Sequence, residues 1–304
     1  MPNKPHRTPM HTTIIRDVDG STRLDRALRA AFPDWGRQTV DRLISGRDVA
    51  VNGKTVWLAS WKVKRGDRIE VFADPTPKTP PPAAFDDAWI IAVETHWLVV
   101  DKPAGLLAHS TRWSDAPGLL ELAQARFPRE AETLALFHRL DRDTSGLVLF
   151  SRTAAANRYL DHAFKARLVE KEYLAVVPTP NRLASTGEIN LPLAPDPARR
   201  DKMRVVDKGG KWALTRYEVL STRDGRQLVR CWPVTGRTHQ LRVHLAALGA
   251  PIIGDRLYAG ETNLRQRLML HAHRLTLPAQ EGWPQSIFGA PLPAEFEEWR
   301  GLVE

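Results

Sequence analysis

The feature that most constrains the fold is a proline-rich segment that divides the chain into a short part and a long part. Five prolines occur within residues 75–82. Because proline fixes its φ angle and has no backbone N–H, such a segment continues neither a helix nor a central strand. It favours an extended conformation of about 3.1 Å per residue, roughly 25 Å in all. We therefore predict a linker over residues 75–87 between two folding units.

The shorter part has the pattern of a small module of helices and a hairpin. Residues 1–20 mix charges, histidines and prolines without apolar periodicity, which predicts a flexible tail. From Leu24 apolar residues recur at helical spacing until Pro33, and a second helical pattern follows. Asn52-Gly53 then indicates a hairpin turn. A helix-helix-hairpin module is expected over residues 21–74.

Many basic residues lie along this module, and a solvated charged face is one explanation for them. The segments Arg23–Leu28, Arg37–Ile44, Val51–Lys54 and Gly66–Ile69 support another. Through them, residues 21–72 resemble the alpha-L RNA-binding module of a small-subunit ribosomal protein. The resemblance implies that helices present arginines to RNA phosphates, which positions a substrate without reading its sequence. The candidates for this contact are Arg26, Arg37, Arg42 and Lys54.

The charge balance favours a phosphate-rich partner. Among 304 residues, 44 Lys and Arg oppose 35 Asp and Glu, which gives a net charge of +9 and makes nucleic acid the first expectation. No apolar run approaches the ~18 residues of a membrane span, and the N-terminus lacks the apolar core of a secretion signal. The single cysteine, Cys231, lies in an apolar run, where a buried inert thiol is expected. We expect a cytoplasmic protein.

The longer part, residues 88–304, contains one stretch with marked chemical character, His138–Leu147. It places two aspartates and two arginines before a Thr-Ser-Gly turn and an apolar strand-like run. We identify Asp141 as its reactive residue, because a neighbouring arginine keeps a carboxylate ionised and oriented, as a nucleophile or base requires. Gly146 supplies the conformational freedom of the turn. Taken alone, this pattern is more often a structural ion pair.

Other chemistries fit the sequence less well. His239 and His244 are five residues apart and fall on different helix faces, which is poor spacing for a metal site. Ser145 lacks the Gly-x-Ser-x-Gly surroundings of a serine nucleophile. Neither a P-loop nor a dinucleotide fingerprint is present. No metal or organic cofactor is expected. A second basic stretch, residues 199–216, is either a solvated hairpin or a further RNA contact.

Several separated segments occur in one order along the longer part: His138–Leu147, Lys171–Ala175, Gly236–His244 and Pro251–Asp255. In these segments the chain resembles the RluA family of RNA pseudouridine synthases. The resemblance implies an α+β fold with a mixed, largely antiparallel sheet, carried by residues 88–304. It also implies isomerisation of uridine in RNA without a cofactor.

The resemblance implies roles for individual residues. Asp141 would attack the target uridine at the ribose or at the base, after which the uracil detaches, turns and rejoins through carbon 5. Tyr173 would stack on the flipped base and help to remove its proton, while Arg242 would pair with Asp141. Arg139 would fill the gap left by the extruded nucleotide, and Leu270 would pack beneath the base. Further substrate contacts are expected from His138, Thr144, Arg237, His239 and Gln240.

The RNA target is less constrained than the chemistry. Relatives with the alpha-L module imply large-subunit ribosomal RNA as the first choice and transfer RNA as the second. We expect the protein to be a monomer. A protein of different class, which binds RNA or assists assembly after losing catalysis, is the alternative. The presence of Asp141, Tyr173 and Arg242 together favours the enzyme.

Overall fold

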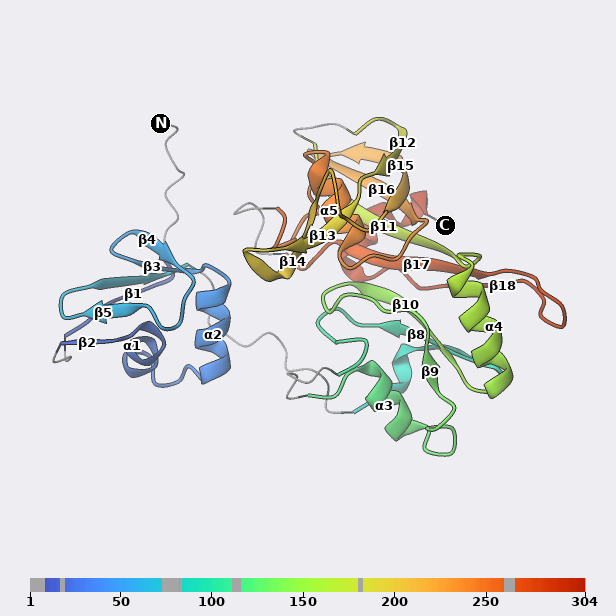
Figure 1. Ribbon diagram of the computed structural model, residues 1–304, viewed down its shortest axis with the longest axis horizontal. Helices are drawn as coiled ribbons and strands as arrows, with labels where there is room; N and C mark the ends of the chain where they lie inside the picture. The colour runs from blue at the N-terminus through green and yellow to red at the C-terminus, as the bar shows by residue number, and fades with distance from the viewer. Residues whose placement is uncertain are drawn as a thin grey trace. The chain divides into compact units, whose positions relative to one another are not determined.

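The computed structural model describes residues 9–16, 20–72, 82, 84–110, 116–179, 183–259 and 266–303. The chain forms two compact units, Met1–Pro80 and Pro81–Glu304 (Figure 1). Most of the expected linker, and much of the expected tail, lies outside the described residues. Among the described helices, none is both long enough and apolar enough to cross a membrane.

In the first unit, two helices pack against short strands around one apolar core. The helix α1 (Leu24–Ala31) ends before Pro33, and α2 (Arg37–Ser45) follows, as their apolar spacing predicted. Asn52 and Gly53 both adopt positive φ angles in the turn between β3 and β4, which form the predicted hairpin. The strands are β1 (His11–Ile14), β2 (Ser21–Arg23), β3 (Val49–Val51), β4 (Lys54–Val56), β5 (Lys62–Lys64) and β6 (Arg68–Val71).

The prediction of a flexible tail is wrong for β1. This strand pairs in antiparallel fashion with β6, which places it at the edge of the sheet β1-β6-β3-β4. Its His11 ring lies edge-on to Phe32 and Trp35, with centroids 5.6 and 5.2 Å apart. Apolar periodicity failed here because the strand is stabilised by backbone hydrogen bonds and ring contacts with segments distant in sequence.

The second unit has the predicted α+β fold with a mixed, largely antiparallel sheet (Figure 1). In the described residues the strand order is β12-β15-β16-β11-β17-β10-β8-β7, with β18 beside β17 and β9 beside β10. The strands are β7 (Ile90–Val93), β8 (Trp97–Lys102), β9 (Ala135–Leu136), β10 (Ser145–Ser151), β11 (Glu170–Pro178), β12 (Thr186–Asn190), β13 (Leu193–Asp196), β14 (Arg199–Val205), β15 (Leu214–Arg223), β16 (Arg226–Pro233), β17 (Leu270–Leu277) and β18 (Ser286–Gly289). The helices are η1 (Asp87–Trp89), α3 (Leu119–Arg126), α4 (Ala154–Lys165), α5 (Gln240–Ala247) and η2 (Ala294–Leu302).

Helices on both faces bury the central strand β10 completely. Side chains of a strand alternate between faces, so Leu147 and Leu149 pack in the cluster that contains α4, whereas Val148 and Phe150 pack in the cluster that contains α3. Burial on both faces explains the continuous apolar run in the sequence. It also makes β10 a fixed support for the loop that precedes it.

Gly146 allows β10 and β17 to pair in parallel at the start of β10. Its φ angle is +112°, and a Cβ atom there would lie 2.2 Å from the Ala272 carbonyl oxygen. Only glycine accepts both conditions. The prediction of a turn that needs glycine is therefore confirmed, and the reason is close strand approach as well as backbone conformation.

Candidate active site

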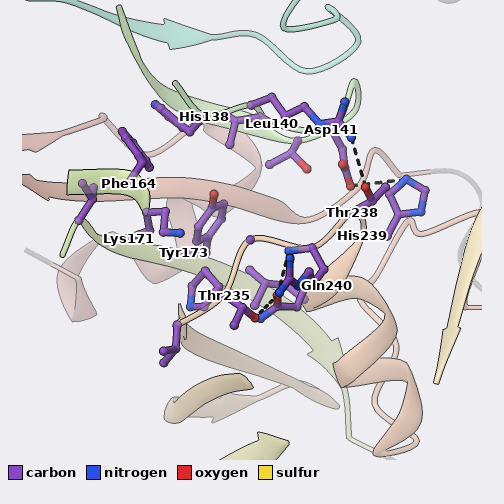
Figure 2. Close-up of a pocket in the computed structure, with 18 of the residues that line it drawn as sticks. His138, Leu140, Asp141, Phe164, Lys171, Tyr173, Thr235, Thr238, His239 and Gln240 are labelled. Atoms are coloured by element: carbon purple, nitrogen blue, oxygen red, sulfur yellow. Dashed lines mark hydrogen bonds and ion pairs between the residues drawn. The ribbon is translucent and has the colours of Figure 1, made fainter. Parts of the chain in front are cut away.

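A cavity of about 490 Å³ opens between the loop before β10, the strand β11 and the segment that leads into α5 (Figure 2). All ten residues that the sequence predicted for catalysis and substrate contact line this cavity. From the loop come His138, Arg139, Asp141 and Thr144, from the strands Tyr173 and Leu270, and from the α5 segment Arg237, His239, Gln240 and Arg242.

Asp141 lies in the loop before β10, and hydrogen bonds hold this loop in place. Its carbonyl oxygen accepts the Thr144 N–H at 3.1 Å. Beneath the loop, the buried Lys102 ammonium donates to the carbonyl oxygens of Arg142, Pro103 and Leu106 at 2.8–3.1 Å. Burial lowers the pKa of Lys102 to about 7. The Asp141 carboxylate keeps 26% of its side-chain surface exposed, so a substrate can reach it.

Arg242 holds the Asp141 carboxylate and is itself held from behind. Its Nη1 donates to Asp141 Oδ2 at 3.0 Å, whereas Nε and Nη2 donate to the two oxygens of Asp255 at 2.7 and 2.8 Å. Asp255 is fully buried and also accepts the N–H groups of Leu257 and Tyr258. This bidentate pair fixes the guanidinium plane, and the remaining nitrogen then fixes the orientation of Asp141.

Tyr173 projects from β11 into the cavity near Asp141 (Figure 2). A register shift between Glu172 and Tyr173 interrupts the pairing of β11 with β17, and such bulges re-aim side chains beside active sites. Burial, together with the Asp141 charge, raises the pKa of the Tyr173 phenol. The cavity therefore presents a protonated phenol ring beside the carboxylate.

His239 connects the Asp141 site to Tyr258, which the sequence did not single out. His239 Nε2 lies 3.8 Å from Asp141 Oδ2, and Nδ1 forms a 2.9 Å hydrogen bond with the Tyr258 hydroxyl. That hydroxyl also accepts the Met203 N–H of β14 at 2.9 Å. Burial lowers the pKa of His239, opposed by the Asp141 charge, and raises the pKa of Tyr258 to about 12. The predicted basic stretch, residues 199–216, is thus connected to the site through the Met203 backbone N–H.

Gln240 is turned inward, although it was expected to contact substrate. Its side-chain oxygen accepts the Thr235 hydroxyl at 2.6 Å and the Arg237 N–H at 3.0 Å. Its nitrogen donates to the Leu214 carbonyl and the Thr215 hydroxyl, each at 3.0 Å. The amide has no spare donor. It fixes the turn before α5.

His138 is likewise engaged by the protein. Its Nε2 accepts the Leu149 N–H at 2.9 Å, and its ring stacks on Phe164 with centroids 5.5 Å apart. Burial, with a smaller effect of the Lys171 charge, lowers the pKa of His138 to about 3. The ring is neutral and fastens the Asp141 loop to β10.

The remaining predicted residues lie at the rim or in the wall of the cavity. Arg139 is exposed and donates to the Thr238 hydroxyl at 3.2 Å, and Arg237 donates to the Trp212 carbonyl at 2.9 Å. Thr144 and Leu270 are buried. The distribution of charge is uneven, because the described lining has one carboxylate, Asp141, and six cations, which are Arg139, Lys165, Arg167, Lys171, Arg237 and Arg242. Such a cavity suits a polyanionic substrate.

Sequence reasoning gave no role to Asp255, Tyr258, Lys102 or Lys171. Asp255 and Lys171 do lie inside segments that carried the family resemblance, so a signal for them existed. Nothing local in the sequence indicated that Tyr258 reaches His239. Within the described ranges, no group of three or more His, Cys, Asp or Glu side chains is arranged to hold a metal ion. Cys231 is buried and its pKa is raised to about 12, as expected of an inert thiol.

Comparison with known proteins agrees with a site built to act on RNA. The model of the RNA pseudouridylate synthase family matches residues 96–247, and the S4 domain model matches residues 22–69. The chain is 32% identical to ribosomal large subunit pseudouridine synthase D of Nitrosomonas europaea, over 92% of this chain and 83% of the relative. It is 38% identical to dual-specificity RNA pseudouridine synthase RluA of Pasteurella multocida, over 70% of this chain and 96% of the relative.

Solved structures show the same fold. The structure of human RNA pseudouridylate synthase domain containing 1 is 29% identical, has a TM-score of 0.57 and covers 72% of this chain and 86% of that chain. The chain therefore belongs to the RNA pseudouridine synthase family, whose members are isomerases that act on RNA, and it is of the RluA and RluD type. The resemblance inferred from the sequence is confirmed.

Proposed function

We propose that the enzyme converts specific uridines of large-subunit ribosomal RNA to pseudouridine, with Asp141 as the nucleophile. The observation that carries this proposal is the Asp141 carboxylate, which is the one acidic group in the described lining and is held by Arg242 at 3.0 Å. The N1–C1′ bond of the target breaks and a C5–C1′ bond forms. The C5 proton is lost to solvent and N1 gains a proton, so the reaction needs no second substrate.

The cavity supports a mechanism in which the target nucleotide leaves the RNA stack. A base inside a helix cannot reach Asp141, and enzymes that modify bases extrude them into closely fitting pockets. Tyr173 offers a ring on which the base stacks, and Leu270 packs beneath it. Arg139 at the exposed rim fills the place of the extruded nucleotide. His239, Thr144 and Arg237 contact the substrate at the cavity wall.

The first unit docks the RNA through its phosphates. Arg26 and Lys54 are exposed, and the Arg37 side chain is 84% exposed with only a loose ion pair to Asp41 at 3.8 Å. Arg42 lies next to Arg37 in a shallow surface hollow of this unit. Exposed arginines on short helices suit contact with backbone phosphates, which gives affinity without sequence selection.

The choice of ribosomal RNA is supported by the names of similar proteins. Ribosomal large subunit pseudouridine synthase D of Nitrosomonas europaea is similar over most of both chains, and the S4 match covers the first unit. The dual-specificity name of the Pasteurella multocida relative keeps transfer RNA as the second candidate. The third candidate, a protein that binds RNA without catalysis, is disfavoured by the intact Asp141–Arg242 pair.

The test combines a tritium-release assay with mapping in cells. RNA labelled with tritium at uracil C5 releases the label when the C5–C1′ bond forms, so purified enzyme is given large-subunit ribosomal RNA and transfer RNA in parallel. We expect release from ribosomal RNA, and loss of the same pseudouridines from cells that lack the protein. Release from transfer RNA alone would overturn the target. Absence of release from either RNA, with binding retained, would favour the non-catalytic alternative.

A further inference from the structure

The ammonium group of Lys171 lies in the cavity without a protein partner. Lys171 stands two residues before Tyr173 on β11, and both side chains project into the same space (Figure 2). In the described part of the chain, Lys171 makes neither a hydrogen bond nor an ion pair through its side chain. Burial lowers the pKa of this ammonium.

The other cations that line the cavity are engaged by the protein, which sets Lys171 apart. Their partners are Thr238 for Arg139, Asp161 for Lys165, the Trp212 ring for Arg167, the Trp212 carbonyl for Arg237, and Asp141 and Asp255 for Arg242. A partly buried charge without a counter-ion costs free energy. An enzyme that carries such a charge inside its reaction cavity recovers that free energy when an anion forms there.

Lys171 and Asp141 act on different parts of the cavity. In Figure 2, Lys171 lies on one side of Tyr173 and Asp141 lies on the other. A base that stacks on Tyr173 with its sugar toward Asp141 therefore extends its far edge along β11 toward Lys171. In uracil, that edge carries carbonyl oxygen.

We propose that Lys171 stabilises the negative charge that develops on the carbonyl oxygens of the target uracil. This inference rests on the proposed function of Asp141. If Asp141 attacks C1′, the C1′–N1 electron pair leaves with the base, and the uracil anion spreads its charge over N1, O2 and O4. If Asp141 attacks C6, the C5–C6 electron pair moves toward C4 and O4 becomes an enolate. Either route places charge on carbonyl oxygen. When C5 then bonds to C1′, the bond to Asp141 breaks and its carboxylate is restored, and loss of the C5 proton together with protonation of N1 gives a neutral product.

Lys171 in this position should increase the reaction rate more than the affinity for the substrate. In the ground state the uracil carbonyls are neutral and gain little from the ammonium, whereas the anion gains much more beside a partly buried charge. A preorganised group of this kind contributes about 10²–10³-fold to the rate. Lys171 thus complements Asp141, because one group forms the new bond and the other receives the displaced charge.

The test measures single-turnover rates at saturating RNA for Lys171→Met, which keeps most of the length of the side chain and removes its charge. We expect a loss of about 10²–10³-fold, partial recovery in Lys171→Arg, and an unchanged or raised melting temperature for Lys171→Met. RNA with 5-fluorouridine at the target position is the matched substrate, followed by disappearance of that nucleoside. Its more acidic ring carries the charge with less help, so the loss should be smaller.

Lys165→Met is the matched variant for the loss of a cavity cation. Lys165 is 76% exposed and paired with Asp161 at 2.8 Å, so its replacement should raise the half-saturating RNA concentration more than it lowers the single-turnover rate. A Lys171→Met enzyme with the wild-type rate, or with a defect that vanishes at saturating RNA, would overturn the inference in favour of no role or a phosphate contact. An equal loss on both substrates would overturn it too. Asp141→Asn in the same assay separates this failure from failure of the proposed function.

Discussion

Arginines in the two units of this protein differ in exposure and in how firmly the protein holds them. The Arg37 side chain in the first unit is 84% exposed, and its nearest carboxylate lies 3.8 Å away. The Arg242 side chain in the second unit is 9% exposed and makes three hydrogen bonds of 2.7–3.0 Å to Asp255 and Asp141. The first is open to solvent and loosely paired, whereas hydrogen bonds on both sides fix the orientation of the second.

The difference teaches where affinity and rate originate. An exposed guanidinium attracts phosphate through a screened interaction that weakens with salt. A buried guanidinium contributes little to attraction at a distance but fixes the proposed nucleophile, Asp141, and misplacement of a reacting group by 1 Å lowers a rate by about 10²-fold. Changes in the first unit should therefore alter binding, and changes around Arg242 should alter turnover.

Asp141→Asn should have the largest effect. The amide keeps the shape of the carboxylate but cannot form the covalent bond to uridine, so single-turnover tritium release should fall by about 10⁴-fold or more. The dissociation constant for RNA, measured by filter binding, should change little. Appreciable turnover by this variant would remove Asp141 from the role of nucleophile.

Tyr173→Phe should have the next largest effect. In the proposed mechanism the ring stacks on the base, and this variant keeps it. The variant loses the hydroxyl, which in this mechanism accepts the C5 proton while giving up its own, and general acid–base groups contribute about 10²–10⁴-fold. Burial raises the pKa of this phenol, so the rate of the wild type should show no titration of Tyr173 near neutral pH. A Tyr173→Phe enzyme of full activity would show that the hydroxyl takes no part in proton transfer.

Asp255→Asn tests whether the buried Arg242 must be held in one orientation. It removes the charge that orients Arg242, so we expect a rate loss of about 10–100-fold and a free energy of unfolding lower by about 3–5 kcal/mol. Chemical denaturation of the same protein gives the stability. The matched control is Glu188→Gln, because the Arg216–Glu188 pair is exposed at 62% and 57% and should change stability by less than ~1 kcal/mol. Equal effects of the two variants would erase the distinction between buried and exposed arginines.

Local sequence patterns were sufficient for much of the fold. The two helices before Pro33 and after Gly36, the Asn52-Gly53 hairpin and the strand after Gly146 each follow from spacing or turn chemistry within a few residues. They were predictable because their main stabilising contacts, or their conformational limits, are visible in one window of the chain. The strand β1 was missed because its partner, β6, lies more than fifty residues further along.

The sequence predicted which residues line the site but not which of them are hydrogen-bonded to one another. Family resemblance selected ten residues that line one cavity, yet sequence does not state which hydrogen bonds a side chain makes. We predicted that Gln240 contacts the substrate, but its amide is hydrogen-bonded to the protein and stabilises the turn before α5. Asp255 looked like part of a motif and is the group that orients Arg242. Such assignments depend on which atoms the fold brings together, which no local window contains.

The double variant Arg26→Gln/Arg37→Gln should have the smallest effect. It removes two exposed arginines of the first unit. Both side chains lie on the surface of the first unit and contribute no buried contact, so the melting temperature and the single-turnover rate at saturating RNA should stay unchanged. The half-saturating RNA concentration should rise severalfold, and the slope of log affinity against log salt should fall by about one for each lost phosphate contact.

Arg126→Gln is the control for this last variant. Arg126 is also exposed, but it is paired with Asp87 at 2.8 Å in the second unit, so its loss should leave the salt slope as it is. A slope that changes equally in both variants would mean that net charge alone attracts the RNA. A slope that changes in neither would transfer the docking role from the first unit to the basic stretch of residues 199–216, where exposed lysines and arginines follow the β14 strand. A fall confined to Arg26→Gln/Arg37→Gln would establish that exposed arginines in the first unit set how tightly RNA is held.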